Sequence, residues 1–202
     1  RGHPILIALT VDWLNVGHSL AEINDRIAID DYRSLLVQRV LTFTNPVYKI
    51  IMIMAHIYRR FNQEILLQIA PDYRDGTIKK ILLSLSKFSF IKYRPPFGDT
   101  PGFLALHDEM RYMISKFCLS SYDPQEYKRS RWTESVIEYY SNELAKENLD
   151  TEMQNLQLEQ LHYMLYLKTQ DGWNRAKVLF EKADDHRDIE FMEAINQECS
   201  SF

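Results

Sequence analysis

The chain has 202 residues, 46% hydrophobic and 26% charged, which is ordinary for a globular protein with room for one large or two small domains. Its net charge of −4 gives no overall electrostatic case for binding nucleic acid, and no apolar run is long enough to span a bilayer. The two cysteines, Cys118 and Cys199, form neither a metal-binding motif nor a disulfide framework, which favours a reducing, cytoplasmic setting.

A helix is predicted at the start of the chain, over Pro4–Val16. Proline suits the first helical turn because its missing N–H has no helical partner to lose there, and Gly17 suits the C-terminal cap. A second helix is predicted to follow and to end before Asn45-Pro46. Together these elements predict a helical subdomain over residues 1–44.

Residues 45–120 carry the pattern of a winged helix, which is three helices followed by a β-hairpin. The three helices are predicted at Val47–Tyr58, at Glu64–Ala70 with Asn62 as N-cap, and at Ile78–Lys87 with Thr77 as N-cap. The hairpin is predicted to consist of the strand Phe88–Arg94, a turn rich in proline and glycine, and a strand that ends at His107.

The stretch Gly102–Phe117 is predicted to turn from a buried strand directly into a helix. Apolar residues alternate up to Leu106 and then recur at helical spacing from Met110, with Asp108 in the position of an N-cap. His107 therefore lies beside a helix N-terminus, whose backbone N–H groups favour anions such as phosphate. The alternative is a polar junction residue with a structural role alone.

Residues 124–202 are predicted to form antiparallel helical hairpins. The spacing of apolar and small residues is similar to that of tetratricopeptide arrays, although no clean repeat of 34 residues is present. Four helices are predicted: Gln125–Lys146, Glu152–Gln170 capped by Thr151, Trp173–Ala183 after a turn at Asp171-Gly172, and Ile189–Gln197. The predicted fold class is thus mainly α, with a helical subdomain, a winged helix and helical hairpins in that order.

Motifs of self-contained enzymes are missing from the sequence. There is no Gly-x-x-x-x-Gly-Lys-Ser/Thr loop for a triphosphate, no His-Glu-x-x-His and no Gly-x-Ser-x-Gly. The six histidines are scattered, and none pairs with another at metal-ligand spacing. We therefore predict no catalytic residue and no metal site, and we do not expect this chain to be an enzyme by itself.

Basic residues offer a second hypothesis, in which the winged helix binds DNA. The candidate phosphate contacts are Lys79, Lys80 and Lys87 on the third helix and Lys92 and Arg94 on the following strand. The same helix has no arginine or asparagine to read base edges. A protein-interaction surface is therefore the favoured interpretation of this face.

Two short motifs in order resemble those of STAND-type signalling NTPases, the class that includes NB-ARC and NACHT proteins. Gly2-His3-Pro4 resembles the Gly-x-Pro motif that opens the helical domain after the ATPase core, and Leu106-His107-Asp108 resembles the Met-His-Asp motif that ends the winged helix. Leucine replaces methionine at the first position of the second motif. The Walker motifs and the nucleotide-binding core of the family are not in this sequence, so we expect the chain to be part of a longer ATPase.

The resemblance implies a role for three residues. Pro4 would pack against adenine, His107 would contact the β-phosphate of ADP, and Asp108 would hold the junction. ADP or ATP with Mg²⁺ is expected only together with the ATPase core of the parent protein, which would be the main partner, and the helical tail would bind other proteins. The alternative is a winged-helix transcriptional regulator with a helical effector or dimerisation domain, and a third hypothesis is a helical scaffold that binds only protein.

Overall fold

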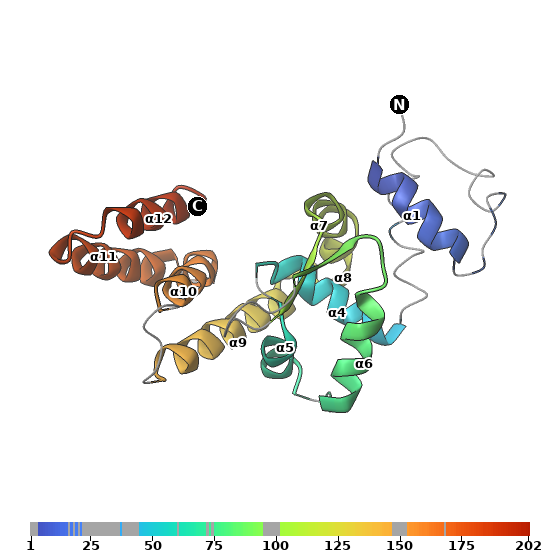
Figure 1. The fold of residues 1–202 in the computed structure, drawn as a ribbon, viewed down its shortest axis with the longest axis horizontal. Helices are drawn as coiled ribbons and strands as arrows, with labels where there is room; N and C mark the ends of the chain where they lie inside the picture. Colours follow the sequence, from blue (N-terminus) through green and yellow to red (C-terminus); the bar gives the residue numbers. More distant parts are fainter. Residues whose placement is uncertain are drawn as a thin grey trace. The chain divides into compact units, whose positions relative to one another are not determined.

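The structure is a computed structural model that describes residues 4–15, 17, 19, 21, 37, 45–59, 61–71, 73, 75–94, 102–146, 153–167 and 169–202. The chain divides into two compact units, a first unit over Arg1–Arg129 and a second unit over Ser130–Phe202 (Figure 1). The described part is mainly helical with one small antiparallel hairpin, which confirms the predicted fold class at this level.

The first described helix is α1 (Pro4–Asn15), close to its predicted bounds. Gly17 follows it with a φ of +92°, and its N–H donates to the Leu14 carbonyl at 3.0 Å. This left-handed conformation suits glycine because it has no Cβ, and it explains why the helix ends here. The second predicted helix of residues 1–44 lies outside the described residues, apart from the buried Val37.

Three helices build most of the core of the first unit: α4 (Asn45–His56), α5 (Gln63–Ile69) and α6 (Asp75–Leu85). The central residues of α4 are buried on every side, as expected for a helix that is apolar all round. Asn62 is confirmed as the N-cap of α5, since its side chain accepts from the backbone N–H of Ile65 at 2.9 Å.

A two-stranded antiparallel sheet follows, with β1 (Ile91–Arg94) paired to β2 (Phe103–Leu106). Phe61 adds a single bridge to the other edge of β2, where its carbonyl accepts from the N–H of Leu104 at 2.8 Å. The order of three helices and a hairpin is the order predicted for residues 45–120. We refer to residues 45–106 as the helix–hairpin module.

Two predicted boundaries in this module were wrong. Thr77 is not an N-cap, because α6 begins at Asp75 and Thr77 lies exposed in its first turn. The strand predicted from Phe88 begins only at Ile91. Two consecutive turns precede it, in which Phe88 donates to the Leu85 carbonyl and Ile91 donates to the Phe88 carbonyl. The N–H and the carbonyl of Phe88 are used within these turns, so they are not available to extend the strand.

A continuous helical segment follows the hairpin as α7 (Asp108–Ile114), a π-helical turn η1 (Ser115–Leu119) and α8 (Ser120–Tyr122). Its inner face packs on α4. The buried residues of this face are Met110, Met113, Ile114, Cys118 and Leu119. Burial raises the pKa of the Cys118 thiol to about 11, so this cysteine is uncharged at neutral pH.

The remaining helices are α9 (Tyr127–Leu144), α10 (Met153–Leu167), α11 (Thr169–Asp185) and α12 (Ile189–Cys199). The last three pack on one another around one apolar core. The core residues are Leu161, Leu165, Ala176, Leu179, Ala183, Phe191 and Ile195.

The predicted cap Thr151 lies outside the described residues. Among the described residues, no helix is both long and apolar enough to cross a bilayer.

The turn predicted at Asp171-Gly172 is wrong, because both residues lie inside α11. Gly172 is buried, and a Cβ placed on it would lie 2.7 Å from both the backbone N and the Cα of Leu165. The glycine therefore does not end a helix. It allows α10 and α11 to approach closely.

Gly172→Ala is expected to destabilise the chain by about 1–3 kcal/mol, because the new methyl group overlaps backbone that a side-chain rotation cannot move. Gly76→Ala is the matched control. Gly76 also lies in a helix, but a methyl group added there would have no atom within 4 Å, so this change is expected to stabilise by about 0.4–1 kcal/mol. Urea unfolding followed by circular dichroism measures both, and equal effects would contradict the close-approach role of Gly172.

Candidate functional site

The predicted strand-to-helix junction is present, and His107 occupies its turning point. The His107 N–H donates to the Phe90 carbonyl at 3.0 Å, which continues the pairing of the two strands by one step. The His107 carbonyl accepts from the N–H of Arg111 at 2.9 Å, which is the first hydrogen bond of α7. His107 therefore belongs to the hairpin through its N–H and to the helix through its carbonyl.

The N-cap of α7 is His107, so the prediction of Asp108 as N-cap was wrong. The backbone of His107 is extended, with φ −58° and ψ 138°, whereas Asp108 is already helical. The helix therefore starts one residue earlier than a side-chain cap by Asp108 would require. The His107 side chain is half-buried and makes no capping hydrogen bond, so its ring is not used to close the helix end.

Asp108 points into solvent between two cations. Its side chain is 84% exposed, with Oδ2 at 4.0 Å from Lys92 Nζ and Oδ1 at 3.9 Å from Arg111 Nη2. Ion pairs this long and this exposed contribute little to stability. They do, however, bring one cation from β1 and one from α7 to the same helix start.

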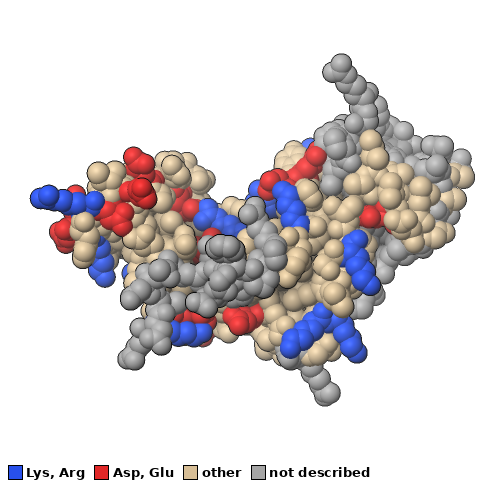
Figure 2. Space-filling view, viewed as in Figure 1, with Lys and Arg blue, Asp and Glu red and all other residues tan. Residues whose placement is uncertain are grey.

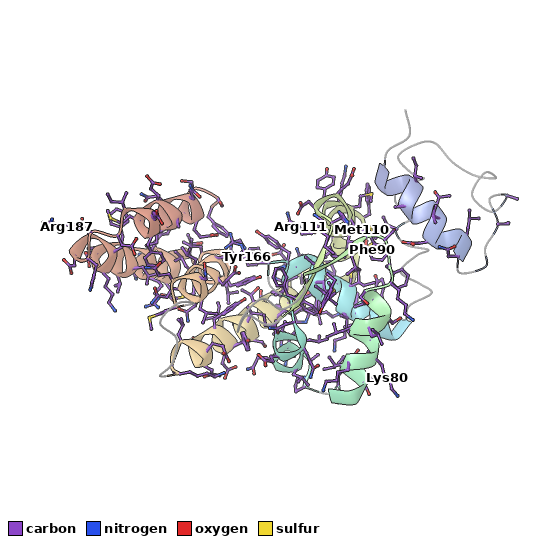
Figure 3. The ribbon with its side chains drawn as sticks, viewed as in Figure 1. Lys80, Phe90, Met110, Arg111, Tyr166 and Arg187 are labelled. Carbon is purple, nitrogen blue, oxygen red and sulfur yellow. The ribbon has the colours of Figure 1, made fainter. Side chains whose placement is uncertain are left out.

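Arg111 is further positioned by an aromatic ring. Its guanidinium carbon lies 3.9 Å from the centroid of the Tyr58 ring, within the range of a cation–π contact. The residue is labelled beside α7 in Figure 3. Because the guanidinium stacks on Tyr58, it is held near the junction whether or not Asp108 is engaged.

At the junction, His107 is the N-cap of α7, and an ammonium and a guanidinium approach the exposed carboxylate of the next residue, Asp108. This set matches the chemistry that binds phosphate, since both the helix end and Arg or Lys favour anions. Within the described residues, no group of His, Cys, Asp or Glu lies together in a way that could hold a metal ion.

Two of the predicted site residues, Pro4 and Arg94, belong to described elements, but their side chains lie outside the described residues. Pro4 begins α1, but its side chain lies outside the described residues, so its contact with adenine stays a prediction. Arg94 ends β1, and its side chain also lies outside them. Lys92 belongs to the His107 junction through Asp108. Lys79, Lys80 and Lys87 are exposed, and Figure 2 shows basic side chains over α6.

The structure adds contacts that the sequence analysis missed. Asp12 Oδ2 on α1 accepts from the N–H and the hydroxyl of Ser89, at 3.2 and 2.6 Å, and so joins α1 to the turn before β1. These residues are 77 positions apart, and no local pattern signals the pair. The contact of Arg111 with Asp108 did have a signal in the sequence, because residues three apart on a helix are neighbours.

No protein-family model, no curated protein and no solved structure matches this chain. The functional assignment therefore depends on the residues and the geometry of the chain.

Proposed function

We propose that this chain is a regulatory part of a cytoplasmic STAND-type signalling ATPase, with the helix–hairpin module as its winged helix and His107 as a contact to bound nucleotide. The observation that carries the proposal is that the His107 side chain makes no cap hydrogen bond at a helix start where Lys92 and Arg111 both approach Asp108. The two motifs Gly2-His3-Pro4 and Leu106-His107-Asp108 support it.

The mechanism requires only binding by these residues. The imidazole of His107 donates a hydrogen bond to the β-phosphate of ADP held by an ATPase core, and Lys92 and Arg111 add positive charge beside it. While ADP is bound, these contacts favour packing of the helix–hairpin module on the ATPase core. When ATP replaces ADP, that preference is lost and the population shifts to a second arrangement of the domains. The helices of the second unit then serve as a surface for protein partners.

The test is His107→Ala in a protein that joins this chain to its ATPase core. ADP release is expected to accelerate by about tenfold or more, because a hydrogen bond to a charged group contributes about 1.5–3 kcal/mol. Basal signalling output is expected to rise with it. Release of a fluorescent ADP analogue measured by stopped flow reports the rate directly.

His186→Ala is the matched control for that experiment. His186 is an exposed histidine at the end of α11, where its Nδ1 lies 2.7 Å from the Lys182 carbonyl. Its replacement is expected to leave ADP release unchanged. Equal release rates from the His107 variant and the wild type would refute the proposal. So would a reading frame upstream of Arg1 without a Gly-x-x-x-x-Gly-Lys-Ser/Thr loop.

A further inference from the structure

A groove on the first unit lies apart from the His107 junction. It has a volume of about 410 Å³ and runs between the start of α5, the second half of α6 and the hairpin. This volume is within the range of ligand-binding pockets in proteins. Its apolar lining comes from Phe61, Leu82, Leu83, Tyr93, Phe103 and Leu104.

Of the three polar side chains in the groove, Asn62, Gln63 and Ser86, two make hydrogen bonds to backbone three residues away. Asn62 accepts from the N–H of Ile65 as the cap of α5, and the Ser86 hydroxyl donates to the Leu83 carbonyl at 2.9 Å. These groups have less capacity left for a polar ligand. The groove therefore suits apolar groups.

Two residues of the groove expose far more apolar surface than the fold requires. The core-facing side of α6 consists of Ile78, Ile81 and Leu85, which are buried, whereas Leu83 is 65% exposed. Tyr93 on β1 is 58% exposed. Large apolar side chains that gather at one exposed groove mark a surface for a partner, because burying them there is favourable.

Positive charge flanks the same groove. Lys80, labelled in Figure 3, lies about one helical turn before Leu83, and Lys87 lies about one turn after it. Both lysines are exposed. The whole first unit has 17 lysines and arginines against 13 aspartates and glutamates, a net charge of +4, although the chain as a whole is at −4. An occupant of this groove is therefore favoured if it is acidic as well as apolar.

We propose that the groove binds an acidic amphipathic helix of a partner protein. Apolar residues on one face of that helix enter the groove beside Leu83 and Tyr93, and its carboxylates lie near Lys80 and Lys87. A helix laid into an apolar groove is a common mode of peptide recognition. Duplex DNA fits less well, because the centre of this surface is apolar and the Asn62 side-chain oxygen is already used as the cap of α5.

The probe is a displayed library of random peptides that are long enough for roughly four helical turns. It is selected on the full 202-residue chain after depletion on the Leu83→Asp variant. The enriched peptides are expected to carry a net negative charge and apolar residues at i, i+3 or i+4, and i+7. No enrichment over the Leu83→Asp variant, or enrichment of basic or purely polar peptides, overturns the proposal.

Fluorescence anisotropy with one enriched peptide then tests the two parts of the groove. Leu83→Asp is expected to weaken binding at least tenfold, while Tyr112→Ser, at another exposed aromatic of the first unit outside the groove, leaves it unchanged. Lys80→Glu combined with Lys87→Glu is expected to weaken binding several-fold at low salt and less at high salt.

The exposure of these side chains in the structure makes unfolding of the variants unexpected, and circular dichroism checks this. Equal binding by the wild type and the Leu83→Asp variant overturns the proposal. Displacement of the peptide by random duplex DNA at near-physiological salt also overturns it, because the surface would then be a nucleic-acid interface.

Discussion

Replacing Glu198 by alanine is expected to destabilise the second unit by about 1–3 kcal/mol, the cost of leaving a buried polar group without its hydrogen-bond partner. The Nδ1 of His162 on α10 lies 2.6 Å from Oε1 of Glu198 on α12, and the two side chains are only 8% and 7% exposed. The rings of Tyr163 and Phe202 lie against the imidazole. Because these groups limit access of water, the alanine variant leaves a buried polar ring without its carboxylate.

Urea unfolding of the full chain measures the loss, and hydrogen exchange of amides in α10 and α12 shows where it occurs. Glu193→Ala is the matched control, since Glu193 is an exposed glutamate on the same helix and its removal is expected to change stability by less than about 0.5 kcal/mol. Replacing both His162 and Glu198 with leucine is expected to restore most of the stability. Equal losses in the Glu198 and Glu193 variants would contradict a structural role for the pair.

Local chemistry made part of the fold predictable. The Asn62 cap depends on a bond to Ile65 three residues later, and the end of α1 depends on the left-handed conformation of Gly17. The buried helix α4 follows from a run of apolar residues longer than a strand needs. In each case the deciding contacts lie within a few residues, so the sequence pattern contains them.

The failures arise where the deciding contact is distant in sequence. The sequence pattern predicts Gly172 as a turn residue, because the pattern does not show that Gly172 lies against the Leu165 backbone. The His162–Glu198 pair spans 36 positions. At the candidate site, Asp108 and Arg111 are neighbours by helical spacing, but Lys92 joins them only because of the hairpin register that places it opposite Ala105. The sequence alone contains neither the register nor the approach of helices.

The second large effect is expected at Asp123, which the sequence analysis did not select. This buried carboxylate accepts from the backbone N–H groups of Lys128 and Arg129, at 3.2 and 2.8 Å, at the start of α9. The Arg129 Nε lies 3.5 Å from it, and the Arg129 Nη2 donates to the Asp123 carbonyl at 2.9 Å. Asp123 therefore caps the first turn of α9 and pairs with a charged side chain.

Asp123→Ala is expected to destabilise the chain by about 2–4 kcal/mol, since it removes a helix cap together with hydrogen bonds to a charged group. Asp123→Asn keeps acceptor capacity and loses the charge, so its effect is expected to be smaller. Asp108→Ala is the control, because that carboxylate is exposed and its pairs are long. Equal urea midpoints for the Asp123→Ala and Asp108→Ala variants would refute the capping role.

The same carboxylate predicts how stability changes with pH. Burial raises the pKa of Asp123, but the backbone N–H groups of Arg129 and Lys128 and the Arg129 guanidinium outweigh it, so the pKa lies below its ordinary value. A depressed pKa in the folded state means that the stabilisation is complete above the unfolded pKa of about 3.9 and is lost as the pH falls through the folded value. Wild type and Asp123→Asn are therefore expected to differ most in unfolding free energy at neutral pH and to converge in acid. A difference that stays constant between neutral and strongly acidic pH would show that the charge of Asp123 does not contribute.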